Sequence, residues 1–106
     1  MCMSMAPQEA IDGAVPDDLT AFQTHLLAVV ADMEGKHGLA IKQEMEEEYG
    51  QEVYHGRLYP NLDTLCDKGL VGKGVIDRRT NSYTITTKGQ RVLVDYVAWL
   101  ESRSGD

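Results

Sequence analysis

The sequence predicts a mainly α-helical fold with one small β-ribbon, because of the way its apolar residues are spaced. Three stretches before residue 70 carry apolar side chains at helical spacing, and so does a fourth stretch from about residue 87. Between them, residues 71–86 contain two short strand-like runs around a turn-forming link, the pattern of a two-stranded ribbon. With 106 residues, of which 42% are hydrophobic, the chain is expected to form one globular domain with a modest core.

The first two helices are bounded by start and stop residues. The first should begin at Thr20, because Gln23 three residues later completes a capping-box pattern, and it should end before Gly35. The second should run from Gly38 to a stop at Gly50. Its candidate apolar positions are Leu39, Ile41, Met45 and Tyr49.

The third helix should run from about His55 to Lys68, with Gly69 as its C-terminal cap. Its apolar face carries Leu58, Leu62, Leu65 and Cys66. Its opposite face carries a polar stripe of Arg57, Asn61, Thr64 and Lys68. Pro60 has no N–H to bond the Gly56 carbonyl, so we expect a loosened or kinked first turn.

The ribbon and the last helix complete the chain. The arms of the ribbon should be Val71–Asp77 and Ser82–Thr86, joined by the turn formers of residues 78–81. The last helix should begin at about Thr87, with Gln90 three residues on as a second capping-box candidate. It carries more apolar surface than a terminal helix on a small monomer needs, which predicts a dimer interface. The predicted interface residues are Leu93, Tyr96, Val97, Trp99 and Leu100.

The order helix, helix, helix, ribbon, helix is that of a winged helix-turn-helix followed by one C-terminal helix. In such a fold the third helix enters the DNA major groove and the ribbon reaches toward the backbone or the minor groove. We therefore expect a flexible N-terminal arm over residues 1–17, a winged-helix DNA-binding domain over residues 18–88 and a C-terminal dimerisation helix over residues 89–106.

The distribution of charge agrees with this expectation although the net charge does not. The chain has a formal charge of −7, which by itself argues against nucleic acid. Residues 1–53 hold eleven acidic and two basic residues, a net −9, whereas residues 54–91 hold seven basic and three acidic residues, a net +4. The basic segment coincides with the predicted third helix and ribbon.

Three ordered segments resemble the PadR-type winged-helix transcriptional regulators: "GLAIKQEMEEEYG", then "GRLYPNLDTLCDKGLV", then "YTITTKGQRVL". The similarity includes a Leu-Tyr-Pro core at Leu58, Tyr59 and Pro60, and a Tyr-x-Ile-Thr-x-x-Gly stretch from Tyr83 to Gly89. It covers about residues 20–100 and implies a dimeric repressor or activator. The acidic, lysine-poor composition indicates a haloarchaeal member. The resemblance is to one that regulates the response to reactive oxygen. A single helix after the wing leaves no separate effector-binding domain.

The predicted contacts with double-stranded DNA lie on the third helix and the ribbon. Arg57 suits guanine and Asn61 suits adenine in the major groove, while arginines at the tip of the ribbon suit a narrow minor groove. Tyr59 resembles the family tyrosine that meets the phosphate backbone, although packing between helices would also explain it. Arg57 and Asn61 could instead be solvated polar residues, and His55 could contact phosphate or merely cap the helix. Lys73 and Lys88 could serve phosphates or nothing specific. The full predicted set is His55, Gly56, Arg57, Tyr59, Asn61, Thr64, Lys73, Arg78, Arg79, Asn81 and Lys88.

Other classes of function have less support. No apolar run approaches the roughly 20 residues that span a bilayer, and no signal peptide is evident, so we expect a cytoplasmic protein without a membrane partner. Neither zinc-type cysteine or histidine spacing nor a nucleophile with a positioned base occurs, so no metal, cofactor or enzymatic activity is expected. Two alternatives stay open: a winged-helix protein-interaction module, and a sensor that acts through the thiol of Cys66 or Cys2 or through a ligand in a core pocket.

The acidic surface leads to a hypothesis about salt. In molar salt the Debye length falls to about 3 Å, so distant carboxylates are screened from DNA. We expect the protein to work in a high-salt cytoplasm. There, cations should gather between its acidic residues and the DNA, so salt ions are expected at the interface.

Overall fold

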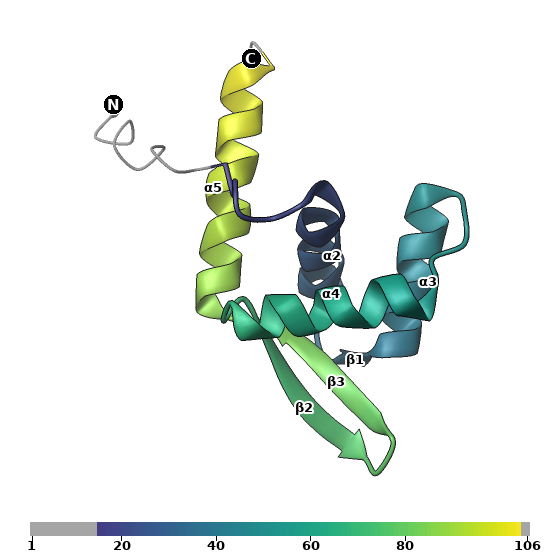
Figure 1. The fold of residues 1–106 in the computed structure, drawn as a ribbon. Helices are drawn as coiled ribbons and strands as arrows, with labels where there is room; N and C mark the ends of the chain where they lie inside the picture. The colour runs from purple at the N-terminus through teal and green to yellow at the C-terminus, as the bar shows by residue number, and fades with distance from the viewer. Residues whose placement is uncertain (1–14, 105–106) are drawn as a thin grey trace.

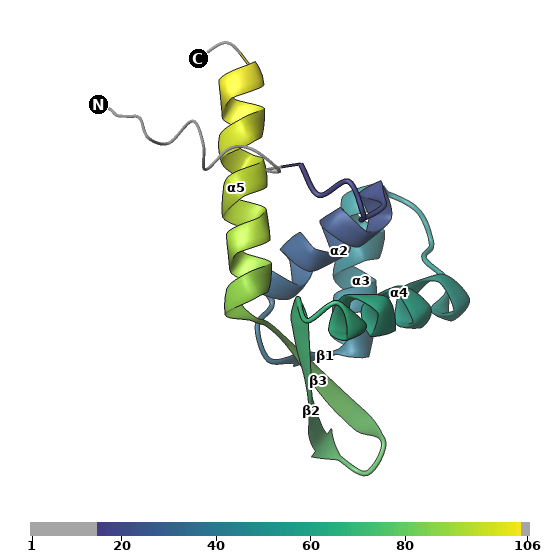
Figure 2. The same ribbon diagram turned by 60° about the vertical axis from the view of Figure 1, so that its left-hand side comes forward.

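The computed structural model describes residues 15–104, in the order α2 (Ala21–Asp32), β1 (Lys36–His37), α3 (Gly38–Tyr49), α4 (His55–Asp67), β2 (Val71–Asp77), β3 (Thr80–Ile85) and α5 (Thr87–Arg103). This confirms the mainly α fold with a small ribbon. Most of the arm predicted over residues 1–17, including Cys2, lies outside the described residues. Helices α2, α3 and α4 pack together, the β2–β3 hairpin extends from them, and the far half of α5 projects beyond the other elements (Figures 1 and 2).

The start of α2 and the end of α3 follow the local signals in the sequence. The Thr20 hydroxyl accepts a hydrogen bond from the Gln23 N–H, and the Gln23 side chain accepts one from the Thr20 N–H, both at 3.1 Å. The capping box predicted here is therefore confirmed. Helix α3 ends at Gly50, whose φ of 69° is the left-handed conformation that glycine adopts without strain.

A third strand was not predicted. The residues Lys36 and His37 form β1, which pairs antiparallel with β3, so that the sheet of the described residues has the order β1-β3-β2. His37 also caps α3, because its Nδ1 accepts the Ala40 N–H at 3.0 Å. Leu39, predicted as an apolar position of this helix, is 48% exposed and does not pack in the core.

The core lies where α2, α3 and α4 meet the sheet. Its fully buried side chains are Leu26, Leu27, Val30, Ile41, Met45, Val53, Leu58, Leu62 and Leu65. Helix α4 supplies three of them and continues through Pro60. It ends at Asp67, one residue before the predicted end, and Gly69 beyond it has a φ of 78°.

The hairpin differs from prediction by one or two residues, whereas α5 begins at Thr87 as predicted and only its capping residue differs. Strand β3 begins at Thr80, so the turn contains only Arg78 and Arg79. Helix α5 is capped by Thr86, whose hydroxyl accepts the Gly89 N–H at 3.0 Å, so the capping box predicted at Thr87 and Gln90 is wrong. A side chain at Gly89 would collide with the Leu70 carbonyl oxygen, which explains a glycine in the first turn of α5.

Glu46 ties α3 to the segment that leads into α4. Its carboxylate accepts the Val53 N–H at 3.0 Å and pairs with Lys42 at 2.9 Å. The bond from the Val53 amide, followed by the one from Lys42, lowers the pKa of the Glu46 carboxyl below its ordinary value of 4.5.

Glu46→Gln is expected to lower the melting temperature at neutral pH. Because the folded pKa is depressed, the stabilisation is present above the unfolded value of 4.5 and is lost as the pH falls through the folded pKa. Thermal unfolding of the two proteins over a pH series measures this, and the difference should vanish in acid. The matched control is Glu47→Gln, an exposed carboxylate on the same helix. A difference that persists unchanged in acid would contradict this role of the carboxylate.

Candidate nucleic-acid interface

Helix α4 and the β2–β3 hairpin form the candidate interface. The C-terminal end of α4 leads directly into β2, and both views place the hairpin next to the helix (Figures 1 and 2). Lys73 of β2 pairs with Asp63 of α4 at 3.5 Å. The Lys73 ammonium, one of the predicted DNA contacts, therefore already has a partner in the protein.

Arg57 is exposed near the start of α4 and is held by an aromatic ring. Its guanidinium carbon lies 4.0 Å from the centroid of the Phe22 ring on α2. Such stacking uses the face of the guanidinium, whereas its N–H donors lie at the edge. Arg57 can therefore be fixed by the protein and still offer hydrogen bonds. The exposed His55 and Gly56 precede it at the start of α4.

Two other residues of the polar stripe use their side chains within the protein. The Asn61 amide nitrogen donates to the Arg57 carbonyl at 2.6 Å, and its oxygen accepts from the Gln23 side chain at 2.9 Å. The Thr64 hydroxyl donates to the Pro60 carbonyl at 3.0 Å. Gln23 and Phe22 are therefore site residues that sequence analysis missed. Phe22 fits the apolar spacing of α2 and Gln23 fits its capping box. Neither pattern indicates a contact with α4.

Tyr59 connects α4 to α3 and to the wing. Its ring stacks on His55, with centroids 5.5 Å apart, and lies so close to Gly38 that a Cβ there would be 2.6 Å from it. It is half-buried, as packing between helices would require. A pocket of about 300 Å³ lies beside it. The pocket is lined by His37, Gly38, Leu39, Tyr59, Arg79, Thr80, Asn81 and Tyr83, and so brings together three of the predicted contacts.

The tip of the wing presents two exposed arginines. The Asp77 carboxylate accepts the Arg79 N–H at 2.9 Å, and this bond is the main reason why the pKa of Asp77 lies below its ordinary value. The turn is therefore stabilised through the backbone, and the side chains of Arg78 and Arg79 extend into solvent. Val75 on β2 is 76% exposed and Ile76 is 53% exposed, beside an irregularity in strand register.

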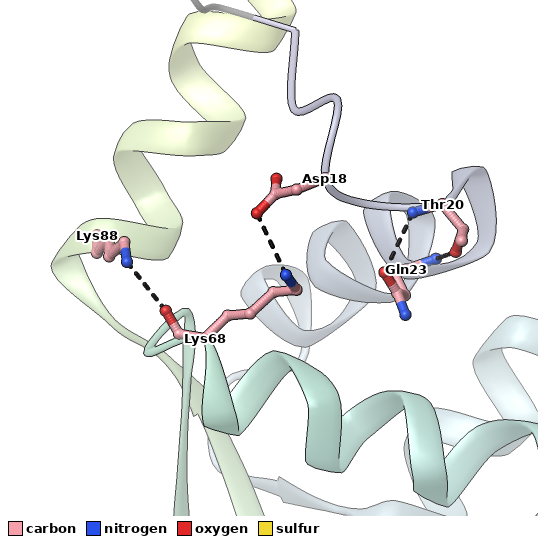
Figure 3. A network of polar contacts seen from close by, with 5 residues as sticks. All are labelled: Asp18, Thr20, Gln23, Lys68 and Lys88. Carbon is pink, nitrogen blue, oxygen red and sulfur yellow. Dashed lines mark hydrogen bonds and ion pairs between the residues drawn. The ribbon is translucent and has the colours of Figure 1, made fainter.

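Lys88, near the start of α5, lies beside the C-terminal end of α4 and apart from the wing tip. Its ammonium donates to the Lys68 carbonyl at 3.0 Å, and the Lys68 ammonium pairs with Asp18 at 3.2 Å (Figure 3). The structure therefore brings Tyr59, Arg79 and Asn81 together at one pocket, whereas Arg57 lies on the side of α4 that faces α2 and Lys88 lies against the C-terminal end of α4.

One face of α5 carries three exposed apolar side chains. Val94, Val97 and Leu100 are spaced three apart and are 66%, 50% and 44% exposed. Leu93 instead packs partly against the core. Tyr96 and Trp99 stack with their centroids 6.2 Å apart.

Cys66 is half-buried on α4. Burial raises the pKa of its thiol, so less of the reactive thiolate is present near neutral pH. This favours a packing role. Within residues 15–104, no group of histidine, cysteine or acidic residues has a metal-binding arrangement, and no helix is long and apolar enough to cross a membrane.

These elements define a winged-helix protein with one helix after the wing, and comparisons with known proteins support that class. The model of the transcriptional regulator PadR-like family matches residues 26–95. The chain belongs to the PadR-like family of transcriptional regulators, as its motifs indicated.

Solved structures agree with this assignment. The complex structure of hsRosR-S1 is 53% identical, covers 86% of this chain and 79% of its own, and superposes with a TM-score of 0.78. The structure of H. salinarum RosR, from crystals grown from NaBr, is 55% identical in sequence. It covers 81% of this chain and 77% of its own, with a TM-score of 0.77. This similarity to RosR agrees with the expectation of a haloarchaeal member of the family.

A more distant structure shares the fold alone. The PadR-like transcription factor of Bacteroides fragilis is 20% identical, covers 79% of this chain and 84% of its own, and has a TM-score of 0.70. A comparison with curated proteins found no match.

Proposed function

We propose that this chain is a sequence-specific DNA-binding transcription regulator that acts as a homodimer. The observation that carries the proposal is the pocket where Tyr59 of α4 meets Arg79 and Asn81 of the wing, with Arg57 exposed near the start of the same helix. In this fold the third helix, here α4, reads the major groove and the wing contacts the flanking backbone or minor groove.

The residues divide by the kind of contact that they can make. Arg57 near the start of α4 is the candidate for base readout, since arginine pairs with guanine in the major groove. Tyr59 and Asn81, which line the pocket beside α3, are the candidates for a phosphate contact. His55, which stacks on Tyr59, and Gly56 after it are further candidates at the start of α4. The candidates for the minor groove are Arg78 and Arg79. Lys73 and Lys88 keep further N–H donors for flanking phosphates beside their partners in the protein. The Thr64 hydroxyl would first have to break its bond to the Pro60 carbonyl.

The apolar face of α5 supports the homodimer. A second copy that covers Val94, Val97 and Leu100 would remove three large apolar side chains from water. Two copies of α4 would then meet a pseudo-palindromic site with half-sites about one helical turn apart. We also propose that the regulator responds to stress in a high-salt cytoplasm, in keeping with its similarity to RosR and its charge of −7.

Selection of duplexes from random fragments at molar salt tests this function. The selected sequences should share a pseudo-palindrome, and their affinity should stay flat or rise between about 0.2 and 2 M salt, because salt screens the acidic residues more than the close contacts. A steep fall in affinity over that range would remove the high-salt account. If no duplex is retained at any salt concentration, a protein-interaction module becomes the better interpretation.

A further inference from the structure

The polar stripe of α4 packs along the start of α2. Three of its four residues contact residues 18–23: Lys68 pairs with Asp18, Asn61 bonds to Gln23, and Arg57 stacks on Phe22. We call these three contacts the α2–α4 seam. Figure 3 shows the Asp18–Lys68 pair at one end of the seam and the Gln23 side chain beside Thr20.

A chain of hydrogen bonds runs through the middle of the seam. The Thr20 N–H donates to Gln23 Oε1 at 3.1 Å, Gln23 Nε2 donates to Asn61 Oδ1 at 2.9 Å, and Asn61 Nδ2 donates to the Arg57 carbonyl at 2.6 Å. The backbone amide at one end and the backbone carbonyl at the other fix which side-chain atom is nitrogen and which is oxygen. Both amides therefore have one consistent orientation, set by the fold.

This chain of bonds supports the part of α4 that its proline weakens. Pro60 has no N–H, so the turn that begins at Gly56 lacks one helical hydrogen bond. The Asn61 side chain gives an additional bond to the carbonyl of the next residue, Arg57. The backbone of Arg57 is thus held through Asn61, and its guanidinium is held by Phe22.

A contact between Asn61 and adenine would have to break this arrangement. Bidentate pairing with adenine uses both the nitrogen and the oxygen of the amide. In the folded protein both atoms are already bonded, and the partner Gln23 is only 9% exposed.

From these contacts we infer that Gln23 is a positioning residue for DNA recognition: through Asn61 it fixes the backbone of Arg57, and Asn61 acts inside the protein instead of reading a base. The inference rests on the proposed function and concerns how the reading side chain is held.

Gln23→Glu separates the two bonds that Gln23 makes. A glutamate still accepts from the Thr20 N–H and keeps the cap of α2, but it cannot donate to Asn61. We expect Gln23→Glu and Asn61→Ala each to lower the ratio of affinities for a wild-type-selected duplex and a scrambled duplex by about three- to tenfold. The double variant should lose no more than the larger single effect, because both changes break one chain of bonds.

Fluorescence anisotropy with the two labelled duplexes measures these ratios, and thermal melts confirm that each variant is folded. Gln43→Glu, an exposed site on α3, adds the same charge and should leave the ratio unchanged. The inference is overturned if Asn61→Ala relaxes preference at one A·T pair while Gln23→Glu changes nothing, or if the two effects add. If the unaltered protein does not distinguish the two duplexes, the proposed function fails first, and this inference fails with it.

Discussion

Replacing Arg78 and Arg79 together with alanine is expected to lower the affinity for duplex DNA on the order of tenfold at moderate salt, with little change in sequence preference. Both side chains extend from the wing tip, so their loss removes two cations without removing core contacts. The turn itself should persist, because Asp77 bonds the backbone N–H of Arg79, which alanine retains.

Arg57→Ala provides the contrast. It should reduce the preference for the selected duplex, because Arg57 is the candidate base reader, and leave binding to unrelated duplexes less affected. Arg91→Ala, which removes an exposed cation near the start of α5, is the matched control. Anisotropy titrations with selected and scrambled duplexes distinguish the outcomes. Unchanged affinity in both the wing variant and Arg57→Ala would show that the DNA-binding surface lies elsewhere.

Val97→Glu combined with Leu100→Glu is expected to convert a dimer into a monomer. The two side chains are 50% and 44% exposed on α5, so the change should cost the isolated domain little stability. In a dimer the same carboxylates would be buried without partners, which is strongly unfavourable. Because a dimer binds both half-sites at once, the monomer should also lose most of its affinity for the operator.

Sedimentation at molar salt measures the assembly directly, against a chain mass of 11.8 kDa. Ser102→Glu adds a carboxylate to another face of α5 and should leave the dimer intact. If the unaltered chain sediments as a monomer, or if the double variant remains dimeric, α5 is not the dimer interface.

Local signals explain why so much of the fold could be predicted. The Thr20 capping box, the left-handed Gly50 and the leucines of α4 act within a few residues of each other in the chain. Strand β1 is different, since two residues form a strand only because β3 lies beside them. The choice of Thr86 over Thr87 as a cap likewise depends on a distant partner, since the Thr86 hydroxyl also donates to the Gly69 carbonyl at 2.7 Å.

The candidate site shows the same division. The spacing of its polar residues predicted that this stripe of α4 lies outside the core, and in the structure it does. That spacing could not reveal that residues 18–23 cover part of that stripe, because nothing in the spacing of Asn61 or Lys68 specifies a partner 38 or 50 residues away. The wing tip was simpler to predict, because a two-residue turn leaves its side chains in solvent whatever packs elsewhere.

Chemical-shift mapping of the backbone amides with a selected duplex tests the central claim most directly, since it reports every described element at once. Binding through α4 and the wing predicts the largest shifts in residues 54–61 and 77–82, and small ones in the last two turns of α5. Shifts confined to α5, with α4 and the wing unchanged at saturating duplex, would contradict DNA binding through the winged-helix surface.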